Sequence, residues 1–356
     1  MIPDDMILRV LAMGAAGLVV SLLATRTMIG IAIMDRPNHR SSHKVATPRS
    51  GGVAIILGFL VTLAGCVLVL PELVLPWPLI GTFLASAALL STVSLLDDIR
   101  GVSAGWKFGS QLLAGVILVA GGFRIEALSL PGLGTVELGF AGSLLAMAWL
   151  LFLTNAYNFM DGINGISGAT AMVAACALGL IAWGAGNQFV VLCALATVAG
   201  CAGFMAYNFP GGRIFMGDVG SQFLGLLFGA LTLIGRAGDG TSELISVFVV
   251  PMLLAVYVGD VLFTLARRAL AGERLSEAHR GHLYQLCIRM GASHVQVTGL
   301  YTLFGVVQGA VAWTAQNCLP PTQIPLALLP LIAGYALFAF VVLRAARRRG
   351  LLTTAG

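Results

Sequence analysis

Residues 144–165, LLAMAWLLFLTNAYNFMDGING, decide the fold class of this chain. They begin as an apolar run without a charge, and a helix needs ~20 predominantly apolar residues to cross a bilayer. The run ends in NFMDGING, residues 158–165, which brings two Asn, one Asp and two Gly to the place where hydrocarbon meets water. The stretch therefore predicts a membrane-spanning helix followed by a polar segment with a function at the membrane surface.

The composition extends this prediction to the whole chain. Its 356 residues are 58% hydrophobic and 10% charged, with a mean hydropathy of +0.95, whereas a soluble domain carries about 25% charged residues. Because the apolar residues are spread along the full length, we expect an all-α polytopic membrane protein with a single domain, residues 1–356. The six cysteines show neither a CxxC motif nor regular spacing, so no disulfide framework or zinc site is expected.

The length needed to cross a bilayer predicts about 10–11 transmembrane helices. The candidate spans are 6–33, 51–70, 76–96, 107–122, 141–157, 166–184, 188–208, 219–236, 243–267, 296–316 and 323–343. The fourth is the weakest prediction, because it is short and contains Lys107 and Gln111.

The basic residues predict the orientation. Sixteen of the twenty Lys and Arg lie in the segments that follow odd-numbered spans, and cytoplasmic loops carry an excess of these residues. The polar motifs follow the same spans: DRPNHRSSHKVATPRSGG, SLLDDIRG, TNAYNFMDGING, RIFMGDVGS and SEAHRGHLYQ. We therefore expect an active site on the cytoplasmic face, with the N-terminus outside.

Two of these motifs contain candidate acidic groups at the ends of spans. Asp97 and Asp98 are adjacent, so they repel each other unless a cation or a basic ligand balances them, although a single carboxylate there could simply be solvated. Residues next to each other on a helix point about 100° apart. One carboxylate can therefore face a site while the other orients or binds something else.

In NFMDGING, Asn158 and Asp161 are three residues apart and share a helix face. A helix C-cap would explain Gly162 and Gly165, but not an Asp at a helix C-terminus, where the macrodipole disfavours negative charge. An oxygen-rich face with tight glycine turns suits Mg²⁺, which commonly takes one or two carboxylates plus substrate phosphates.

The remaining motifs add a third acidic group and several cations. Asp218, between Gly217 and Gly220, could cap the following helix, or this helix start could present backbone N–H groups to a phosphate. Acidic groups for a metal and cations for phosphate oxygens are the ingredients of phosphoryl transfer. The candidate cations and imidazoles on the same face are Lys44, Lys107, His279, Arg280 and His282.

Five motifs follow one another in the order HKVATPRSGG, LLDDIRG, NAYNFMDGING, FMGDVGS and HRGHLYQ. With them, the chain resembles the polyprenyl-phosphate N-acetylhexosamine-1-phosphate transferases, glycosyltransferase family 4, over residues 1–345. The resemblance implies transfer of a sugar-1-phosphate from a UDP-N-acetylhexosamine to undecaprenyl phosphate, with release of UMP. It further implies a requirement for Mg²⁺, with Mn²⁺ as an alternative, at the cytoplasmic face of the bacterial inner membrane. The implied partners are both substrates and membrane lipid but no nucleic acid, and a homodimer is left open.

The resemblance also implies roles for matching residues. Asp218 would ligate Mg²⁺, with Asn158 and Asp161 beside it in the metal and nucleotide pocket. Asp97 and Asp98 would deprotonate or orient the lipid phosphate. Further matches are Phe215 against the uracil and Lys44, Lys107, Arg280 and His282 at the phosphates. Asp260, inside the ninth span, matches an Asp to which the resemblance assigns no role.

Two departures from the family pattern bear on the donor sugar. Asn164 stands where many bacterial relatives have Asp, and Tyr284 replaces the second His of the usual HLHH. Both variants resemble enzymes that initiate O-antigen synthesis, which implies a donor sugar such as FucNAc or QuiNAc for a lipopolysaccharide or related glycan.

Three alternatives stay open at this point. A phospho-MurNAc-pentapeptide transferase of peptidoglycan synthesis would share the same chemistry. A secondary transporter would place ionisable residues near the midplane, on broken helices in repeated halves. A prenyl or CDP-alcohol transferase would use a DxxxD pair, which neither acidic cluster contains.

Overall fold

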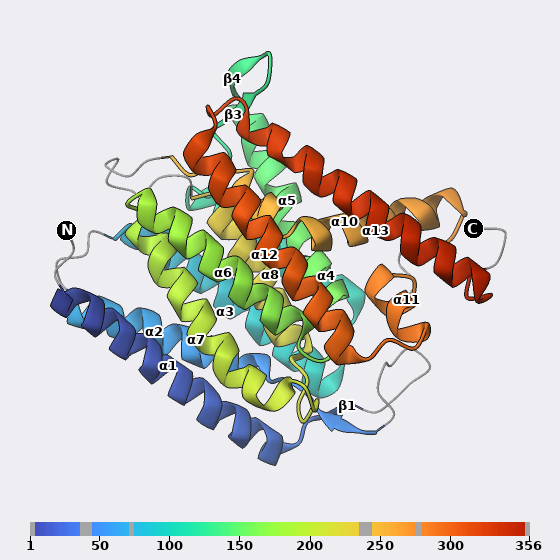
Figure 1. Ribbon diagram of the computed structural model, residues 1–356. Coiled ribbons are helices and arrows are strands. Elements are labelled where there is room, and N and C mark those ends of the chain that lie inside the picture. Colours follow the sequence, from blue (N-terminus) through green and yellow to red (C-terminus); the bar gives the residue numbers. More distant parts are fainter. Residues whose placement is uncertain (1–3, 36–44, 71–74, 235–243, 275–279, 353–356) are drawn as a thin grey trace.

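The computed structural model describes residues 4–35, 45–70, 75–234, 244–274 and 280–352, and these are mostly helical (Figure 1). The longer helices are α1 (Asp4–Ile31), α2 (Gly52–Val69), α3 (Trp77–Arg100), α4 (Ala104–Ala120), α5 (Phe140–Met160), α6 (Ile166–Gly184), α7 (Gln188–Asn208), α8 (Gly217–Thr232), α10 (Ala255–Leu270), α12 (His294–Cys318) and α13 (Leu328–Arg348). The shorter ones are α9 (Val249–Leu253), α11 (Leu283–Arg289) and the 3-10 turn η1 (Ile324–Ala327). Two antiparallel strand pairs complete the described part: β1 (Met34–Asp35) with β2 (Thr47–Pro48), and β3 (Ala127–Leu130) with β4 (Gly134–Glu137).

Within the described residues, 8 helices are long and apolar enough to cross a membrane: α1, α2, α3, α5, α6, α7, α12, and α13 together with η1. The other three predicted spans are also helices, but α4, α8 and α10 have only 17, 16 and 16 residues. In α8 every residue from Val219 to Thr232 is buried, so protein rather than lipid surrounds it. The prediction of an all-α polytopic membrane protein is confirmed.

The ninth predicted span, 243–267, differs from a single helix. It is divided into α9 and α10, and the backbone leaves the helical conformation at Leu254. The side-chain amide of Gln308 in α12, in its favoured orientation, donates to Leu253 O at 2.9 Å and accepts from Val256 N at 3.0 Å. A break at membrane depth is tolerated where neighbouring groups satisfy the freed backbone, and Gln308 supplies both partners here.

Helix α8 packs against α2, α3, α5 and α9 and so forms the centre of the bundle. Glycines permit the close approach: a Cβ on Gly52 of α2 would overlap the Cα of Gly220, and one on Gly225 would lie 2.7 Å from the Cα of Thr154 in α5. In lipid, helices associate largely through such close van der Waals packing. The start of α8 is thereby fixed among its neighbours.

The ends of the bundle differ. The C-terminal ends of α3 and α5 meet the N-terminal ends of α4 and α8 at one end, where side chains of all four helices form hydrogen bonds. The β3–β4 hairpin, which connects α4 to α5, projects from the opposite end (Figure 1). The polar motifs after the first, third, fifth and seventh spans therefore share one end of the molecule.

Candidate active site

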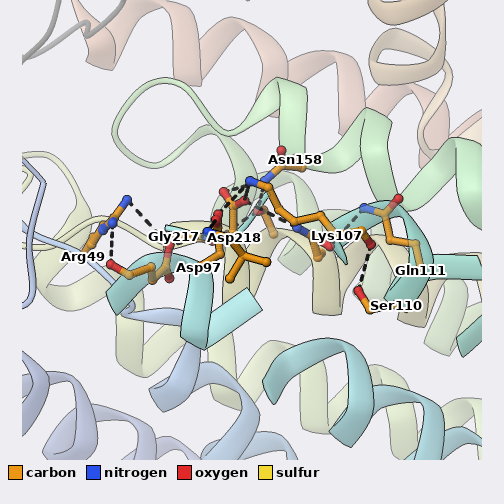
Figure 2. Close-up of polar contacts among 12 residues, drawn as sticks. Arg49, Asp97, Lys107, Ser110, Gln111, Asn158, Gly217 and Asp218 are labelled. Carbon is orange, nitrogen blue, oxygen red and sulfur yellow. Dashed lines mark hydrogen bonds and ion pairs between the residues drawn. The ribbon is translucent and has the colours of Figure 1, made fainter. Parts of the chain in front are cut away.

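Lys107 joins two acidic groups that are far apart in the sequence (Figure 2). Its Nζ donates to Asp97 Oδ2 at 2.7 Å and to Asp218 Oδ2 at 3.3 Å. Asp97 lies in the last turn of α3, Lys107 in the first turn of α4 and Asp218 in the first turn of α8. Three helix ends thus bring two carboxylates and one ammonium group together at one end of the bundle.

The neighbouring Asp98 has a different environment. Its side chain is 1% exposed, whereas that of Asp97 is 12% exposed. Asp98 Oδ2 accepts a hydrogen bond from Ser50 Oγ at 3.0 Å, and Oδ1 accepts from the backbone N–H of Asp218 at 3.2 Å. The guanidinium of Arg49 donates to the backbone carbonyl of Asp98 and lies 3.9 Å from Oδ1. Asp98 therefore ties the end of α3 to the start of α8 and to the segment before α2, while Asp97 faces Lys107.

The segment before α2 pairs with the segment before α8 through backbone hydrogen bonds. Phe215 N–H donates to Pro48 O at 2.8 Å, and Gly51 N–H donates to Phe215 O at 2.9 Å. Phe215, the predicted uracil contact, is half-buried in this pairing. The first and fourth motifs therefore form one structural unit.

Two residues of this unit have left-handed backbone conformations. Gly217 has φ +73°, and a Cβ there would overlap the carboxylate of Asp98. Ser50 has φ +68°, which non-glycine residues seldom adopt, and this turn directs its hydroxyl to Asp98. Arg49 and Ser50 were not predicted as site residues, although they belong to the quoted motif HKVATPRSGG.

Asp218 does not cap its own helix. The N-cap residue of α8 is Met216, which makes no side-chain capping bond. The Asp218 carboxylate instead faces neighbouring helices. Asn158 Nδ2, from the end of α5, donates to Asp218 Oδ1 at 3.0 Å and to Ser221 Oγ at 2.9 Å. Asn158 and Asp218, predicted from two motifs, thus lie in direct contact.

A chain of side-chain amides continues from Asp218 into the bundle. Gln111 of α4 and Asn155 of α5 exchange hydrogen bonds at 2.8 and 3.3 Å, and Gln111 Nε2 also donates to Gln222 Oε1 at 3.1 Å. Figure 2 shows Gln111 one turn beyond Lys107 along α4. In the sequence, Gln111 is notable only as a polar residue within the fourth predicted span. In the structure it links α4 to α5 and α8, and so holds the helices that carry Lys107, Asn158 and Asp218.

Asp161 follows α5 directly and belongs to the same electrostatic cluster. Burial, together with the negative charges of Asp218 and Asp98, raises the pKa of Asp161 from 3.8 to about 7. The turn that carries it ends at Gly165, whose φ of +83° favours glycine. A cation near Asp161 would favour its ionised form.

The chemistry of these acidic residues is compatible with a magnesium ion whose shell substrate phosphates would complete. Within the described ranges, no group of three or more His, Cys, Asp or Glu side chains is arranged to hold a metal ion. However, Asp97 and Asp218 direct one oxygen each to a single cationic group, the Lys107 ammonium. Magnesium commonly takes one or two carboxylates and completes its shell with water and substrate phosphates, so Asp218, with Asp161 electrostatically coupled to it and Asn158 bonded to it, is compatible with such an ion.

The other predicted site residues lie further along the same end. His282 is buried next to the rings of Phe159 and Tyr284, with its Nδ1 3.1 Å from Asp260 Oδ1. Arg280 lies just before α11, and its backbone carbonyl accepts from Arg289 Nη1 at 3.3 Å. Lys44 and His279 lie outside the described residues.

Asn164 contacts the turn that follows α7. Its Nδ2 donates to Pro210 O at 3.2 Å, and its backbone carbonyl accepts from the hydroxyl of Thr298 at 2.8 Å. The residue predicted to influence donor choice is therefore held by both α12 and the 210–213 turn.

The comparisons with known proteins relate the chain to one family. The sequence model described as glycosyl transferase family 4 matches residues 80–236, which contain Asp97, Lys107, Asn158 and Asp218. The chain is similar to the probable undecaprenyl-phosphate N-acetylglucosaminyl 1-phosphate transferase of Bacillus subtilis (strain 168), with 29% identity over 82% of this chain and 79% of the relative. It is 32% identical to the decaprenyl-phosphate N-acetylglucosaminephosphotransferase of Mycobacterium leprae, over 78% of this chain and 76% of the relative. It is 34% identical to the phospho-N-acetylmuramoyl-pentapeptide-transferase of Moorella thermoacetica, over 65% and 73%.

The fold and these similarities define the class of protein first: a multi-pass, α-helical membrane protein with an acidic and basic site at one end of its bundle. Within that class, the chain belongs to glycosyl transferase family 4. The family inferred from the sequence motifs is confirmed.

Proposed function

We propose that this protein transfers an N-acetylhexosamine 1-phosphate from a UDP-sugar to undecaprenyl phosphate and releases UMP. An oxygen of the lipid phosphate attacks the phosphorus that carries the sugar, and the bond from this phosphorus to the oxygen shared with UMP breaks. One phosphoanhydride bond is broken and one is formed, so no further co-reactant is needed. The names of the relatives, which are transferases acting on undecaprenyl or decaprenyl phosphate, support this reaction class.

The observation that carries the proposal is the position of Lys107 between Asp97 and Asp218. An ammonium group held by two carboxylates at a helix end is placed to contact phosphate oxygens, and phosphoryl transfer depends on such positioning and charge stabilisation. Of the adjacent Asp97 and Asp98, only Asp97 binds the Lys107 ammonium. We therefore propose that Asp97 orients the lipid phosphate by holding Lys107 in place. Asp98, which is buried and bonded to Ser50, holds the start of α8 in place.

The proposal includes a magnesium ion held by Asp218, with Asp161 and Asn158 beside it. When bound, the ion would polarise a phosphoryl oxygen and neutralise developing negative charge. Asn158 donates to Asp218 and fixes the direction of its carboxylate. Mn²⁺ is the alternative ion.

We place the site at the cytoplasmic face of the bacterial inner membrane, because the loops at this end carry most of the Lys and Arg residues. Asn164 and Tyr284 support a UDP-N-acetylhexosamine donor and a role in the first membrane step of O-antigen or a related surface glycan. Phe215 is proposed to contact the uracil, and Arg280 and His282 to lie toward the phosphates.

An exchange assay tests the reaction. Purified protein with Mg²⁺ and undecaprenyl phosphate should incorporate radiolabelled UMP into the UDP-sugar pool, because the forward and reverse transfers share UMP. Omission of undecaprenyl phosphate is the control and should abolish the exchange. Incorporation that does not depend on the lipid, or no incorporation with any UDP-N-acetylhexosamine, would refute the proposed reaction.

The donor class needs a separate comparison. The protein should turn over a UDP-N-acetylhexosamine and leave UDP-MurNAc-pentapeptide unchanged. Robust turnover of the pentapeptide donor would instead assign the chain to peptidoglycan synthesis.

A further inference from the structure

Asp260 is a buried carboxylate to which the family resemblance assigns no role. It lies in α10 and its side chain is inaccessible to solvent. Among the described residues, four groups donate to it at 3.0 to 3.2 Å: the hydroxyl of Thr264, Nδ1 of His282, the backbone N–H of Leu283 and the hydroxyl of Tyr301. An ionised carboxylate has about four lone-pair sites, so these donors use its acceptor capacity. Asp260 is therefore arranged as an anchor rather than as a metal ligand or a proton acceptor.

The donors come from three different helices. Thr264 belongs to α10 itself, Leu283 is the first residue of α11, and Tyr301 lies in α12. Leu283 N–H contacts both carboxylate oxygens, at 3.0 and 3.1 Å. A carboxylate partner also requires a proton on Nδ1 of His282, which fixes the tautomer and direction of that ring. Asp260 thus sets the positions of α11 and α12 relative to α10.

Both of these helices hold the NFMDGING segment. From α11, the Tyr284 hydroxyl donates to Phe159 O at 3.0 Å and occupies the space that a side chain on Gly162 would fill. From α12, the hydroxyl of Thr298 donates to Asn164 O at 2.8 Å. Asp260 is therefore linked, through α11 and α12, to the turn that follows α5.

We infer that Asp260 is a positioning residue that holds segment 158–165, through α11 and α12, in the conformation that binds the nucleotide-sugar donor. This inference rests on the proposed function, because it assigns the segment to the donor. Burial of a carboxylate is less favourable than burial of an apolar side chain of similar size, so stability alone does not account for Asp260. The proposed function assigns the lipid phosphate to Lys107 on α4 and Asp97 on α3. The groups that donate to Asp260 belong to neither of these helices.

Kinetic constants for the two substrates test this separation. Asp260→Asn keeps the side-chain size but places an NH₂ group where donors now point. The KM for the UDP-sugar should rise at least about tenfold, as expected for a lost hydrogen bond to a charged group, while the KM for undecaprenyl phosphate stays within about twofold. Thr264→Val is the matched control, because it removes a donor from α10 alone, and it should leave both constants unchanged.

A double-mutant cycle tests whether Asp260 acts through α11. Tyr284→Phe removes only the hydroxyl that reaches Phe159. If Asp260 acts through this contact, Asp260→Asn should have a much smaller effect in the Tyr284→Phe background than in the wild type. Independent, additive effects both with Tyr284→Phe and with Thr298→Val, which removes the α12 contact to Asn164, would overturn the inference, as would equal changes in the KM for donor and acceptor.

Hydrogen exchange tests the anchor without any transferase activity. In Asp260→Asn, amides of residues 283–286 and 161–166 should exchange at least about tenfold faster than in the wild type, whereas Thr264→Val should match the wild type. If the wild type fails the UMP exchange assay but Asp260→Asn shows this faster amide exchange, the proposed function is wrong and the anchor stands. Unchanged exchange in Asp260→Asn would refute the anchor whatever the enzymatic result.

Discussion

At the scale of single residues, two adjacent aspartates have different environments. Asp97 is partly exposed and bound to the Lys107 ammonium, whereas Asp98 is buried and bound to Ser50 and the start of α8. Their side chains point in different directions because neighbouring residues on a helix are about 100° apart. Asp97 therefore lies at the candidate site, whereas Asp98 supports the backbone around it.

Asp218 should be required for turnover but not for folding. Asp218→Asn is nearly isosteric and keeps one acceptor for Asn158, but it removes the charge that faces Lys107 and the proposed cation. A metal ion contributes several kcal/mol of transition-state stabilisation, and each ~1.4 kcal/mol is a factor of ten in rate. We expect turnover to fall at least ~100-fold, with thermal melting in detergent close to wild type. Retention of more than about a tenth of the turnover would mean that the metal is held elsewhere.

Asp161 should make stability depend on pH. Its pKa is raised from 3.8 to about 7, so the folded protein holds this proton more tightly than the unfolded chain. The unfolding free energy should therefore decrease as the pH rises from about 4 to about 7 and remain lower above that range. Asp161→Asn removes this term, so without added metal its melting temperature should exceed that of the wild type by clearly more at pH 8 than at pH 5. An equal difference at both pH values would contradict the raised pKa.

At the scale of helices, the start of α8 depends on glycine contacts. Gly52 of α2 lies directly against Gly220 of α8, with no space for a side chain between them. This contact lies two residues beyond Asp218 and sets the distance between α8 and the segment that contains Ser50. The glycines of RSGG and MGDVG are thus explained by close helix packing as well as by backbone conformation.

Gly52→Ala should destabilise the bundle. The added methyl group would overlap backbone atoms of Gly220, and overpacking of this kind costs about 1–3 kcal/mol. The melting temperature in detergent should fall clearly. Gly299→Ala in α12 is the matched control, because no atom lies within 4 Å of a Cβ there, and its melting temperature should be unchanged or slightly higher. An unchanged melting temperature for Gly52→Ala would show that α2 and α8 can separate without cost.

At the scale of the whole molecule, the polar motifs lie at one end of the bundle. The motifs after the third, fifth and seventh spans meet at the starts of α4 and α8, and the β3–β4 hairpin lies at the other end (Figure 1). The distribution of Lys and Arg predicts that the motif end faces the cytoplasm.

Labelling of introduced cysteines tests this orientation. Positions 42 and 276, both Ser and both outside the described residues, lie in the predicted cytoplasmic segments, whereas Gly132 lies in the β3–β4 hairpin. In intact cells, Ser42→Cys and Ser276→Cys should resist membrane-impermeant thiol reagents, and Gly132→Cys should react. The parent protein, with its six native cysteines, measures the background. Labelling at position 42 or 276 would place the motif end outside the cell.

Much of the architecture was predictable from the sequence. Within the described residues, each of the eleven predicted spans is helical, although only eight are long and apolar enough to cross a membrane and the ninth is broken at Leu254. The family follows from motifs such as LLDDIRG and FMGDVGS. These features are predictable because apolar length and local glycine patterns are properties of continuous stretches of chain. The break at Leu254 was not predicted, because Gln308, which satisfies the freed backbone groups, is far away in the sequence.

The sequence by itself thus determined the all-α membrane class and the residue types of the site. Only the tertiary structure decided that Lys107 binds both Asp97 and Asp218, that Asp98 accepts from the backbone of Asp218, and that Asp260 anchors α11 and α12. These partners are 10, 111, 120, 23 and 41 residues apart in the chain. Most such contacts depend on how whole helices pack against one another, and no local pattern of apolar and polar residues specifies that packing.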